Sequence, residues 1–243
     1  MKFKEKTYDY MLICGDIHSN IDVIPKYLKN MELTNCAVFQ VGDFGIGFDS
    51  EYKELRRLNY LNKRMERSGS DLYIIRGNHD NPMYFDGSYN LSNIFLLTDY
   101  TEVDINGWNI LCIGGAISVD RTERKGYWNP KKTQDYWKNE GLVFDEDKLN
   151  EFRYIDIVIT HSAPNFCYPL SKNGIQKWIA LDNELSNDVL IERHQLSMIY
   201  EILSKNNKII NWYYGHFHQN SISYNNDTKF TCIDINTLIE HRI

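Results

Sequence analysis

The chain has 243 residues, of which 42% are hydrophobic and 14% are aromatic, so it can bury a substantial core within one large domain. Its formal net charge of −6 argues against a broad basic surface for nucleic acid, because such binding depends on clustered lysine and arginine side chains. The longest apolar runs are the length of a strand, far below the roughly 20 residues that a membrane-spanning helix needs, and no membrane span is expected. We therefore expect a single domain over residues 1–243.

The N-terminal residues and the cysteines both favour a cytoplasmic protein. Met1 to Tyr10 mix lysine, glutamate and tyrosine, whereas a secretory signal would place an apolar stretch after a basic start. The five cysteines form no closely spaced pair, and we interpret them as reduced residues of the core. Nothing in the sequence indicates an oligomeric state.

Short runs rich in β-branched and aromatic residues alternate along the chain with amphipathic segments. The runs predict strands at Tyr10–Cys14, Cys36–Val41, Leu72–Ile75, Ile94–Leu97, Asn109–Ile113, Ile155–Thr160 and Ile209–Tyr214. The amphipathic segments predict helices at about Ile21–Met31, Glu51–Arg67 and Asp188–Ser204. Apolar and polar residues alternate over Ser221–Asn236 around Asn225-Asn226-Asp227, which predicts a hairpin. This order is typical of an α/β layered sandwich with some antiparallel pairing.

Five of the predicted strands end in a polar cluster, and most of these clusters begin with glycine. The clusters are Gly15-Asp16-Ile17-His18, Gly42-Asp43, Gly77-Asn78-His79-Asp80, Thr160-His161 and Gly215-His216-Phe217-His218. Ligands in open α/β sheets bind beyond the carboxyl ends of the strands, so we expect these clusters to converge on one crevice. The leading glycines would allow sharp turns or positive φ angles.

The polar clusters supply carboxylates, imidazoles and a side-chain amide but no thiolate. This donor set suits Mn²⁺, Fe or Zn²⁺ and disfavours a structural four-cysteine site. Residues two apart in an extended chain point to the same side, so Asp16 with His18, and His216 with His218, can each face one metal region. Seven candidate ligands are too many for one tetrahedral ion and suit two ions that share a bridging carboxylate. They are Asp16, His18, Asp43, Asn78, His161, His216 and His218.

The order of these motifs resembles the calcineurin-like metallophosphoesterase superfamily, whose pattern is GDxH, GD, GNH with an acid, a lone histidine and GHxH. The resemblance spans residues 15–218 and implies two packed mixed β-sheets flanked by helices. It also implies that a hydroxide held between two divalent metal ions hydrolyses a phosphate ester. The implied ligands are Asp16, His18 and His218 for one ion, Asn78, His161 and His216 for the other, and Asp43 as the bridge.

The same resemblance assigns roles to residues beside the ligands. It implies that His79 stabilises the transition state or protonates the leaving oxygen, and that Arg76 binds phosphate oxygens through its planar guanidinium. Asp80 either orients His79 in catalysis or caps the turn Asp80-Asn81-Pro82.

Several other polar residues are expected to lie outside the site. Arg121 and Arg124 follow a block, Gly114–Ser118, that looks like bacterial and phage members of the superfamily, and solvated loop positions are the simpler interpretation of both arginines. His194 falls in a predicted helix and His241 at the tail, so surface or packing roles are expected for both.

The second motif departs from that of the Ser/Thr protein phosphatases, which read GDxVDRG. Here Gly42 and Asp43 are followed by Phe44-Gly45-Ile46-Gly47, which lacks the second aspartate and the arginine. A site with fewer fixed positive groups should discriminate less against a phosphodiester, so phosphodiesterase activity is favoured over a phosphomonoesterase or protein phosphatase. A catalytically silent metal-bound scaffold is the alternative of another class, and the complete motif set disfavours it. A metalloprotease is disfavoured because the chain lacks HExxH.

Overall fold

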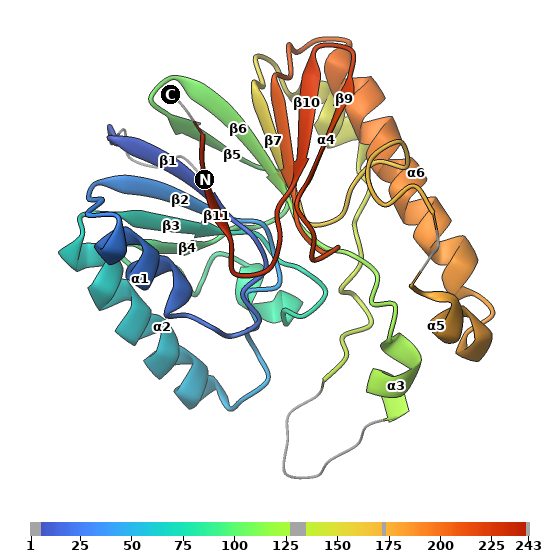
Figure 1. The fold of residues 1–243 in the computed structure, drawn as a ribbon, viewed down its shortest axis with the longest axis horizontal. Helices are drawn as coiled ribbons and strands as arrows, with labels where there is room; N and C mark the ends of the chain where they lie inside the picture. Colours follow the sequence, from blue (N-terminus) through green and yellow to red (C-terminus); the bar gives the residue numbers. More distant parts are fainter. Residues whose placement is uncertain (1–5, 127–134, 172–173, 242–243) are drawn as a thin grey trace.

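Two mixed β-sheets pack face to face in the computed structural model, which describes residues 6–126, 135–171 and 174–241 (Figure 1). Helices cover the outer face of each sheet, so the chain forms four layers in the order helix, sheet, sheet, helix. This arrangement confirms the predicted α/β sandwich.

The first sheet has the strand order β11-β1-β2-β3-β4. Its parallel strands are β1 (Tyr10–Cys14), β2 (Cys36–Gln40), β3 (Asp71–Ile74) and β4 (Ile94–Leu96), and β11 (Leu238–His241) pairs antiparallel with β1. The helices α1 (Val23–Asn30) and α2 (Glu51–Arg67) cover its outer face. In α2 the buried residues Glu54, Leu58, Leu61 and Met65 recur every three or four positions, which places them on one side of the helix.

The second sheet has the strand order β5-β6-β7-β8-β10-β9. Its strands are β5 (Thr101–Ile105), β6 (Trp108–Ile113), β7 (Ile157–Thr160), β8 (Asn211–Tyr214), β9 (Ser221–Asn225) and β10 (Thr228–Cys232). The helices α4 (Glu146–Glu151) and α6 (Leu185–Ser204) cover its outer face. The shorter helices η1 (Pro82–Phe85), α3 (Arg121–Gly126) and α5 (Gln176–Leu181) lie in the connections. The hairpin β9–β10 confirms the predicted turn, with Asn225 opposite Thr228.

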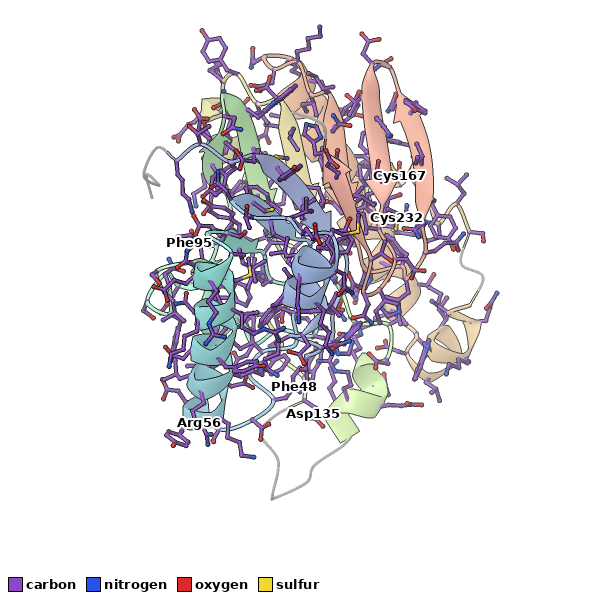
Figure 2. All side chains as sticks on the ribbon, turned by 60° about the vertical axis from the view of Figure 1, so that its left-hand side comes forward. Phe48, Arg56, Phe95, Asp135, Cys167 and Cys232 are labelled. Carbon is purple, nitrogen blue, oxygen red and sulfur yellow. The ribbon has the colours of Figure 1, made fainter. Side chains whose placement is uncertain are left out.

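The central strands are buried on both faces, which explains their nearly continuous apolar sequences. In β1, Met11 and Ile13 pack between the two sheets, whereas Leu12 and Cys14 pack against the helices. The side view separates the halves, with Arg56 and Phe95 on the first and Cys167 and Cys232 on the second (Figure 2). All five cysteines lie in the described ranges, where they are buried and unpaired.

The parallel strands fix where the connecting loops meet. Strands β1, β2 and β3 run parallel to one another in the first sheet, as do β7 and β8 in the second, and the loops that follow these strands gather at one end of the molecule. Across the described ranges, none of the helices combines the length and apolar character needed to cross a membrane.

Candidate metal centre

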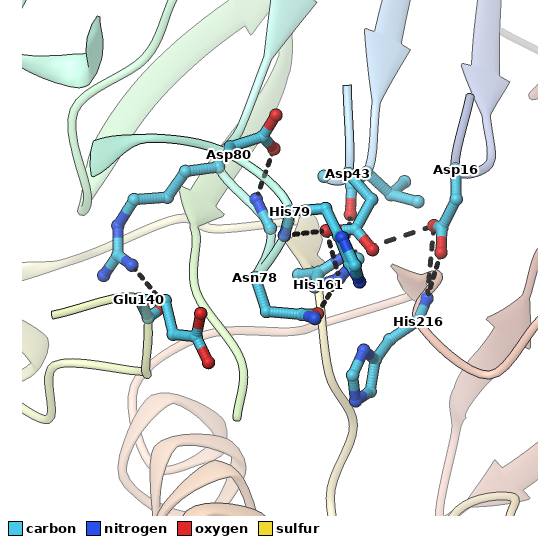
Figure 3. Close-up of polar contacts among 12 residues, drawn as sticks. Asp16, Asp43, Asn78, His79, Asp80, Glu140, His161 and His216 are labelled. Atoms are coloured by element: carbon cyan, nitrogen blue, oxygen red, sulfur yellow. Dashed lines mark hydrogen bonds and ion pairs between the residues drawn. The ribbon is translucent and has the colours of Figure 1, made fainter. Parts of the chain in front are cut away.

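Five loops bring the predicted ligands together at the carboxyl ends of the parallel strands (Figure 3). The ligand atoms form two groups, and within each group all of them lie within 4.8 Å of one another. The groups are Asp16, His18, Asp43 and His218 in one, and Asp43, His161 and His216 in the other. The carboxylate of Asp43 belongs to both groups, which is the geometry expected of a bridging ligand.

In the first group, the Nε2 atoms of two histidines lie close to each other and to the carboxylates. His18 Nε2 lies 3.0 Å from His218 Nε2, which in turn lies 3.2 Å from Oδ2 of Asp16. His18 Nε2 also lies 3.8 Å from Oδ2 of Asp43. The hydrogen bond to Asp16 raises the pKa of His218, because the carboxylate favours positive charge at this point. A metal ion would meet the same attraction.

The second group centres on His161, which is fully buried. Its Nδ1 lies 2.8 Å from the carbonyl oxygen of Val41, so Nδ1 carries the proton and Nε2 faces the ligands in the neutral form. Nε2 lies 3.2 Å from Oδ1 of Asp43 and 3.1 Å from Oδ1 of Asn78. Three groups that can accept hydrogen bonds or bind a metal ion therefore converge on one point, a donor set that fits a divalent ion.

The charges of the second group show why a cation suits it. Burial lowers the pKa of His161, but the carboxylates of Asp43 and Asp16 outweigh burial and raise that pKa to about 10. Burial alone would raise the pKa of Asp43, yet the neighbouring histidines, His161 above all, hold it well below its usual value. Burial, together with His161, lowers the pKa of His216. Asp43 thus stays ionised, and a metal ion would compete with a proton for Nε2 of His161.

The backbone carries unusual conformations at the ligands themselves. His18, Asp43, His216 and His218 have φ angles of 39°, 55°, 68° and 48°, in the left-handed region that side chains other than glycine seldom adopt. Such conformations concentrate at functional sites, where the surrounding fold enforces them. Gly42, with φ of 97°, meets the predicted need for a positive φ. Gly215 does not have a positive φ angle. A side chain is excluded there because a Cβ atom would collide with the carboxylate of Asp16.

His79 lies beside the two ligand groups and contacts them in two ways. Its ring packs edge to face against His18, with centroids 5.1 Å apart, and its backbone N–H donates to Oδ1 of Asp43 at 2.7 Å. Burial lowers the pKa of His79, and the Arg124 guanidinium lowers it further, against the opposing effect of Asp43. The imidazole is therefore neutral at pH 7 and can donate a single N–H.

Among the described residues, Asp80 forms its hydrogen bonds with backbone N–H groups and not with the side chain of His79. Its carboxylate accepts hydrogen bonds from the N–H groups of Gly77, Phe44, Gly45 and Ile46 at 2.7–3.2 Å. These bonds tie the loop after β2 to the loop after β3. In the turn Asp80-Asn81-Pro82, the side chain that accepts a backbone hydrogen bond is that of Asn81, from the N–H of Met83, so the capping alternative for Asp80 also stays a prediction. The catalytic assignment of Asp80 stays a prediction.

Arg76 is buried and its guanidinium is engaged away from the ligand groups. Nε and Nη2 donate to the carboxylate of Asp99 at 2.7–3.2 Å, and Nη1 and Nη2 donate to the carbonyls of Glu140 and Gly141. The carboxylate of Asp99 compensates its charge at short range. Phosphate binding by Arg76 stays a prediction. It would require the guanidinium to give up hydrogen bonds to Asp99, Glu140 or Gly141 in favour of phosphate oxygens.

Arg124 lies much closer to the site than a solvated loop position would allow. Its guanidinium donates to the carbonyl oxygen of Asn78 at 3.2 Å and to Oγ of Ser118, and Nε donates to the carbonyl of Asp135. Figure 2 shows Asp135 at the same end of the molecule as α3. Ser118 in turn accepts a hydrogen bond from Nδ2 of Asn78 at 3.0 Å. The sequence signal for this contact was the Gly114–Ser118 block, which follows β6 as the ligand motifs follow their strands.

Arg121, by contrast, joins secondary-structure elements outside the site. It forms ion pairs with Asp182 and Asp188 at 2.7 Å, which link α3 to α6 and to the residue that follows α5. His194 is exposed on α6, as expected, and His241 is buried in a packing role.

Comparisons with known proteins agree with the motif pattern. The model of the family described as calcineurin-like phosphoesterase matches residues 10–220. A sequence comparison with curated proteins gives no significant match.

Three solved structures are similar to the chain at low identity. GAP50, the anchor in the inner membrane complex of Plasmodium, is 12% identical, with 93% of this chain and 72% of that chain covered and a TM-score of 0.45. Sulfate thiohydrolase SoxB of Thermus thermophilus is 11% identical, with 91% and 38% covered and a TM-score of 0.37. A cold-active protein-tyrosine phosphatase of Shewanella is 15% identical, with 94% and 73% covered and a TM-score of 0.39. Similarity at this level carries no information about the reaction of the chain.

Proposed function

Because the chain belongs to the calcineurin-like phosphoesterase family, we propose that it hydrolyses a phosphate ester at a centre of two divalent metal ions. The observation that carries the proposal is the carboxylate of Asp43, which is shared by both ligand groups. Mn²⁺, Fe and Zn²⁺ suit the nitrogen and oxygen donors. The proposed ligands are Asp16, His18 and His218 for one ion, Asn78, His161 and His216 for the other, and Asp43 for both.

When bound, the two ions would lower the pKa of a shared water and screen the charge of the phosphate. The residues of the chain orient the groups around that centre. Nδ2 of Asn78 is held by Ser118, which turns the amide oxygen toward His161. The neutral imidazole of His79 would donate a hydrogen bond to a phosphate oxygen or to the leaving oxygen, and the loss of one such donor typically costs about 10²–10³-fold in rate.

A phosphodiester is the favoured substrate within this proposal. The loop from Phe44 to Gly47 supplies no arginine, and the charge of Arg76 is compensated by Asp99. Arg124 carries positive charge beside Asn78, and it is the residue that would support the alternative of a phosphomonoesterase or protein phosphatase. A catalytically silent scaffold is the alternative of another class, which the complete set of ligands and His79 disfavours.

The reducing cytoplasm is the proposed location of this reaction. Unpaired cysteines are typical of such compartments, and all five thiols of the chain are buried and unpaired in the described ranges. The proposal involves a phosphate ester as the partner, without a membrane surface or a broad nucleic-acid-binding surface.

The metal content tests the centre directly. We expect protein reconstituted with Mn²⁺ to bind about two ions per chain, as a two-metal site requires. Asp43→Asn should weaken both sites, because its carboxylate belongs to both groups. Asp227→Asn, in the exposed turn of the β9–β10 hairpin, is the matched control and should retain both ions. Elemental analysis without stoichiometric metal after reconstitution would contradict the proposal.

Matched substrates test the preference for a diester. We expect the Mn²⁺-loaded enzyme to have a higher kcat/KM for bis-p-nitrophenyl phosphate than for p-nitrophenyl phosphate, and to act poorly on phosphoserine peptides. The reason is that a diester carries one negative charge where a monoester dianion carries two, and so needs less compensation. Strong activity on phosphopeptides with none on any diester would overturn the preference and leave the two-metal centre intact.

A further inference from the structure

A cavity of about 510 Å³ adjoins the metal centre. It lies between α6 and the loop that follows β7, and two proposed metal ligands, His216 and His218, form part of its wall. Much of the remaining wall is apolar, with Ile117, Pro169 and Val189 among its residues. This volume and composition are typical of sites for small organic molecules, which use apolar walls and a few convergent polar groups.

Two buried polar residues on this wall, Glu192 and Ser162, each carry one atom without a hydrogen-bond partner in the part of the chain that the structure describes. Glu192 is 4% exposed, and neither its Oε2 nor Oγ of Ser162 has a hydrogen-bond partner of ordinary geometry among the described residues. Burial raises the pKa of Glu192 to about 7, and the Ser162 hydroxyl and the backbone of Ile117 lower that pKa in part. Both residues border the larger cavity, and Glu192 also borders a smaller one of about 140 Å³. Unpartnered buried acceptors cost free energy that a ligand donor would recover.

The neighbouring arginine is already engaged. The guanidinium of Arg193 donates to the carbonyl oxygens of Ala163, Pro164 and Cys167 at 2.7–3.1 Å and also to that of Pro169. Arg193 therefore shapes the loop that walls the cavity. Among the described residues of this wall, Glu192 and Ser162 are those with a buried polar atom that has no hydrogen-bond partner.

We propose that this cavity, named here the α6 pocket, binds the organic group of the phosphate ester, and that Glu192 and Ser162 accept hydrogen bonds from a hydroxyl or ammonium group on it. The inference rests on the proposed function, because it places the phosphate at the metal centre that His216 and His218 help to form. The apolar walls favour a ring or branched hydrocarbon, since burying such a surface is favourable. The substrate class is thus a phosphate ester of a small apolar alcohol that carries one hydrogen-bond donor.

Binding of three non-hydrolysable phosphonates to the Mn²⁺-loaded protein tests the pocket, with isothermal titration calorimetry as the readout. Phenylphosphonate should bind at least about tenfold more tightly than methylphosphonate, because its ring enters the apolar pocket. 4-(Aminomethyl)phenylphosphonate should bind about tenfold more tightly again, because its ammonium group pairs with Glu192.

Two variants separate the apolar and the polar parts of the proposal. Glu192→Gln keeps the shape of the side chain but should abolish the gain from the ammonium group, whereas Glu201→Gln, on the exposed side of the same helix, should keep it. Val189→Trp should fill the pocket and remove the gain from the phenyl ring while methylphosphonate still binds.

The outcomes distinguish this inference from the proposed function. Equal affinities for methyl- and phenylphosphonate would overturn the pocket and leave the phosphoesterase intact. If all three phosphonates fail to bind while bis-p-nitrophenyl phosphate is hydrolysed, the comparison is repeated with their singly charged monomethyl esters, and equal affinities of the methyl- and phenylphosphonate esters would overturn the pocket. An undiminished gain in Glu192→Gln would remove Glu192 from recognition. If no phosphonate binds and no ester is hydrolysed, the proposed function itself fails, and the inference fails with it.

Discussion

His79 differs from the other histidines of the site in what holds its ring. Four histidines belong to the two candidate ligand groups and lie close to the carboxylates of Asp16 and Asp43. His79 contacts Asp43 through its backbone N–H, and its imidazole lies outside both groups. Its pKa is lowered, chiefly by burial, so at neutral pH it has no extra proton to give to a leaving oxygen. Of the two roles that the family resemblance implies, donation of a hydrogen bond to developing negative charge is the one that this environment favours.

The first prediction at this scale compares two substitutions of His79. His79→Ala should lower kcat by about 10²–10³-fold, because it removes a hydrogen-bond donor to the charge that develops in the transition state. His79→Gln should lose less, since its amide retains an N–H donor. Metal content should stay near that of the wild type in both variants, because His79 belongs to neither ligand group. Equal losses in the two variants, measured by steady-state kinetics, would argue for proton transfer instead.

At the scale of elements, the site depends on how two loops are fastened to each other. The loop after β2 carries Asp43, and the loop after β3 carries Asn78 and His79. Asp80 joins these loops through its four backbone hydrogen bonds. Burial, followed by repulsion from Asp43, raises the pKa of Asp80 to about 6, so the carboxylate is ionised at pH 7. A charged acceptor of this kind makes strong hydrogen bonds to backbone N–H groups.

Asp80→Ala should therefore destabilise the fold by about 2–4 kcal/mol, because it leaves several buried N–H groups without an acceptor. Asp80→Asn should cost less, since one oxygen acceptor remains. Asp49→Ala removes an exposed carboxylate that pairs with Lys53, and its effect should stay within about 0.5 kcal/mol. Urea denaturation of the metal-free proteins measures all three. A loss of activity without any loss of stability in Asp80→Ala would support the catalytic assignment instead.

The sequence predicts the strands and helices whose apolar pattern can be recognised from adjacent residues alone. The apolar run of β1 and the segment of α2 were predicted with the bounds that the structure has, Tyr10–Cys14 and Glu51–Arg67. Strand β5 was not predicted, although its alternating burial and the Asn106-Gly107 turn before β6 form a recognisable hairpin signal. Strand β11 spans only Leu238–His241 and exists because it pairs with β1, which a local pattern cannot reveal.

The same distinction applies to the site. The sequence predicted that the candidate ligands converge, because each follows a strand in a short motif and the carboxyl ends of parallel strands meet at one edge of a sheet. Six of the seven form the two groups, and Oδ1 of Asn78 lies 3.1 Å from Nε2 of His161. That these residues bind metal ions stays a prediction. The environment of Arg76 was not foreseen, since its partner Asp99 lies 23 residues away and meets it only in the folded chain. The contacts of Arg124 with Asn78 and Ser118 were missed for the same reason.

At the scale of the whole molecule, the interface between the sheets contains a polar pair within an apolar layer. His241 on β11 of the first sheet is 6% exposed, and its Nδ1 shares a hydrogen bond of 2.7 Å with the hydroxyl of Tyr213 on β8 of the second. The ring of Trp108 packs edge to face against His241, with centroids 5.3 Å apart. Nε2 of His241 has no hydrogen-bond partner among the described residues. The pair thus joins the two sheets at a position where an added charge would be poorly solvated.

The stability of the sheet interface should consequently depend on pH through His241. Burial lowers its pKa below the ordinary value of 6.5, and Lys229 adds to this effect, so the folded protein binds a proton at His241 less readily than the unfolded chain. The neutral side chain therefore contributes stability that is present above pH 6.5 and is lost as the pH falls toward the folded-state pKa. His241→Gln cannot take up a proton in this range, and its amide can still bond the Tyr213 hydroxyl.

We expect the free energy of unfolding of the wild type to fall relative to that of His241→Gln as the pH is lowered from about 7.5 to about 5. Urea denaturation of the metal-free proteins across this range measures the difference, and effects of the ligand histidines cancel because both proteins carry them. His194→Gln removes a histidine from the exposed side of α6 and controls for the loss of a histidine outside the interface. A constant difference between the wild type and His241→Gln at every pH would show that the contact between the sheets does not sense protonation, and that His241 acts there only through its shape.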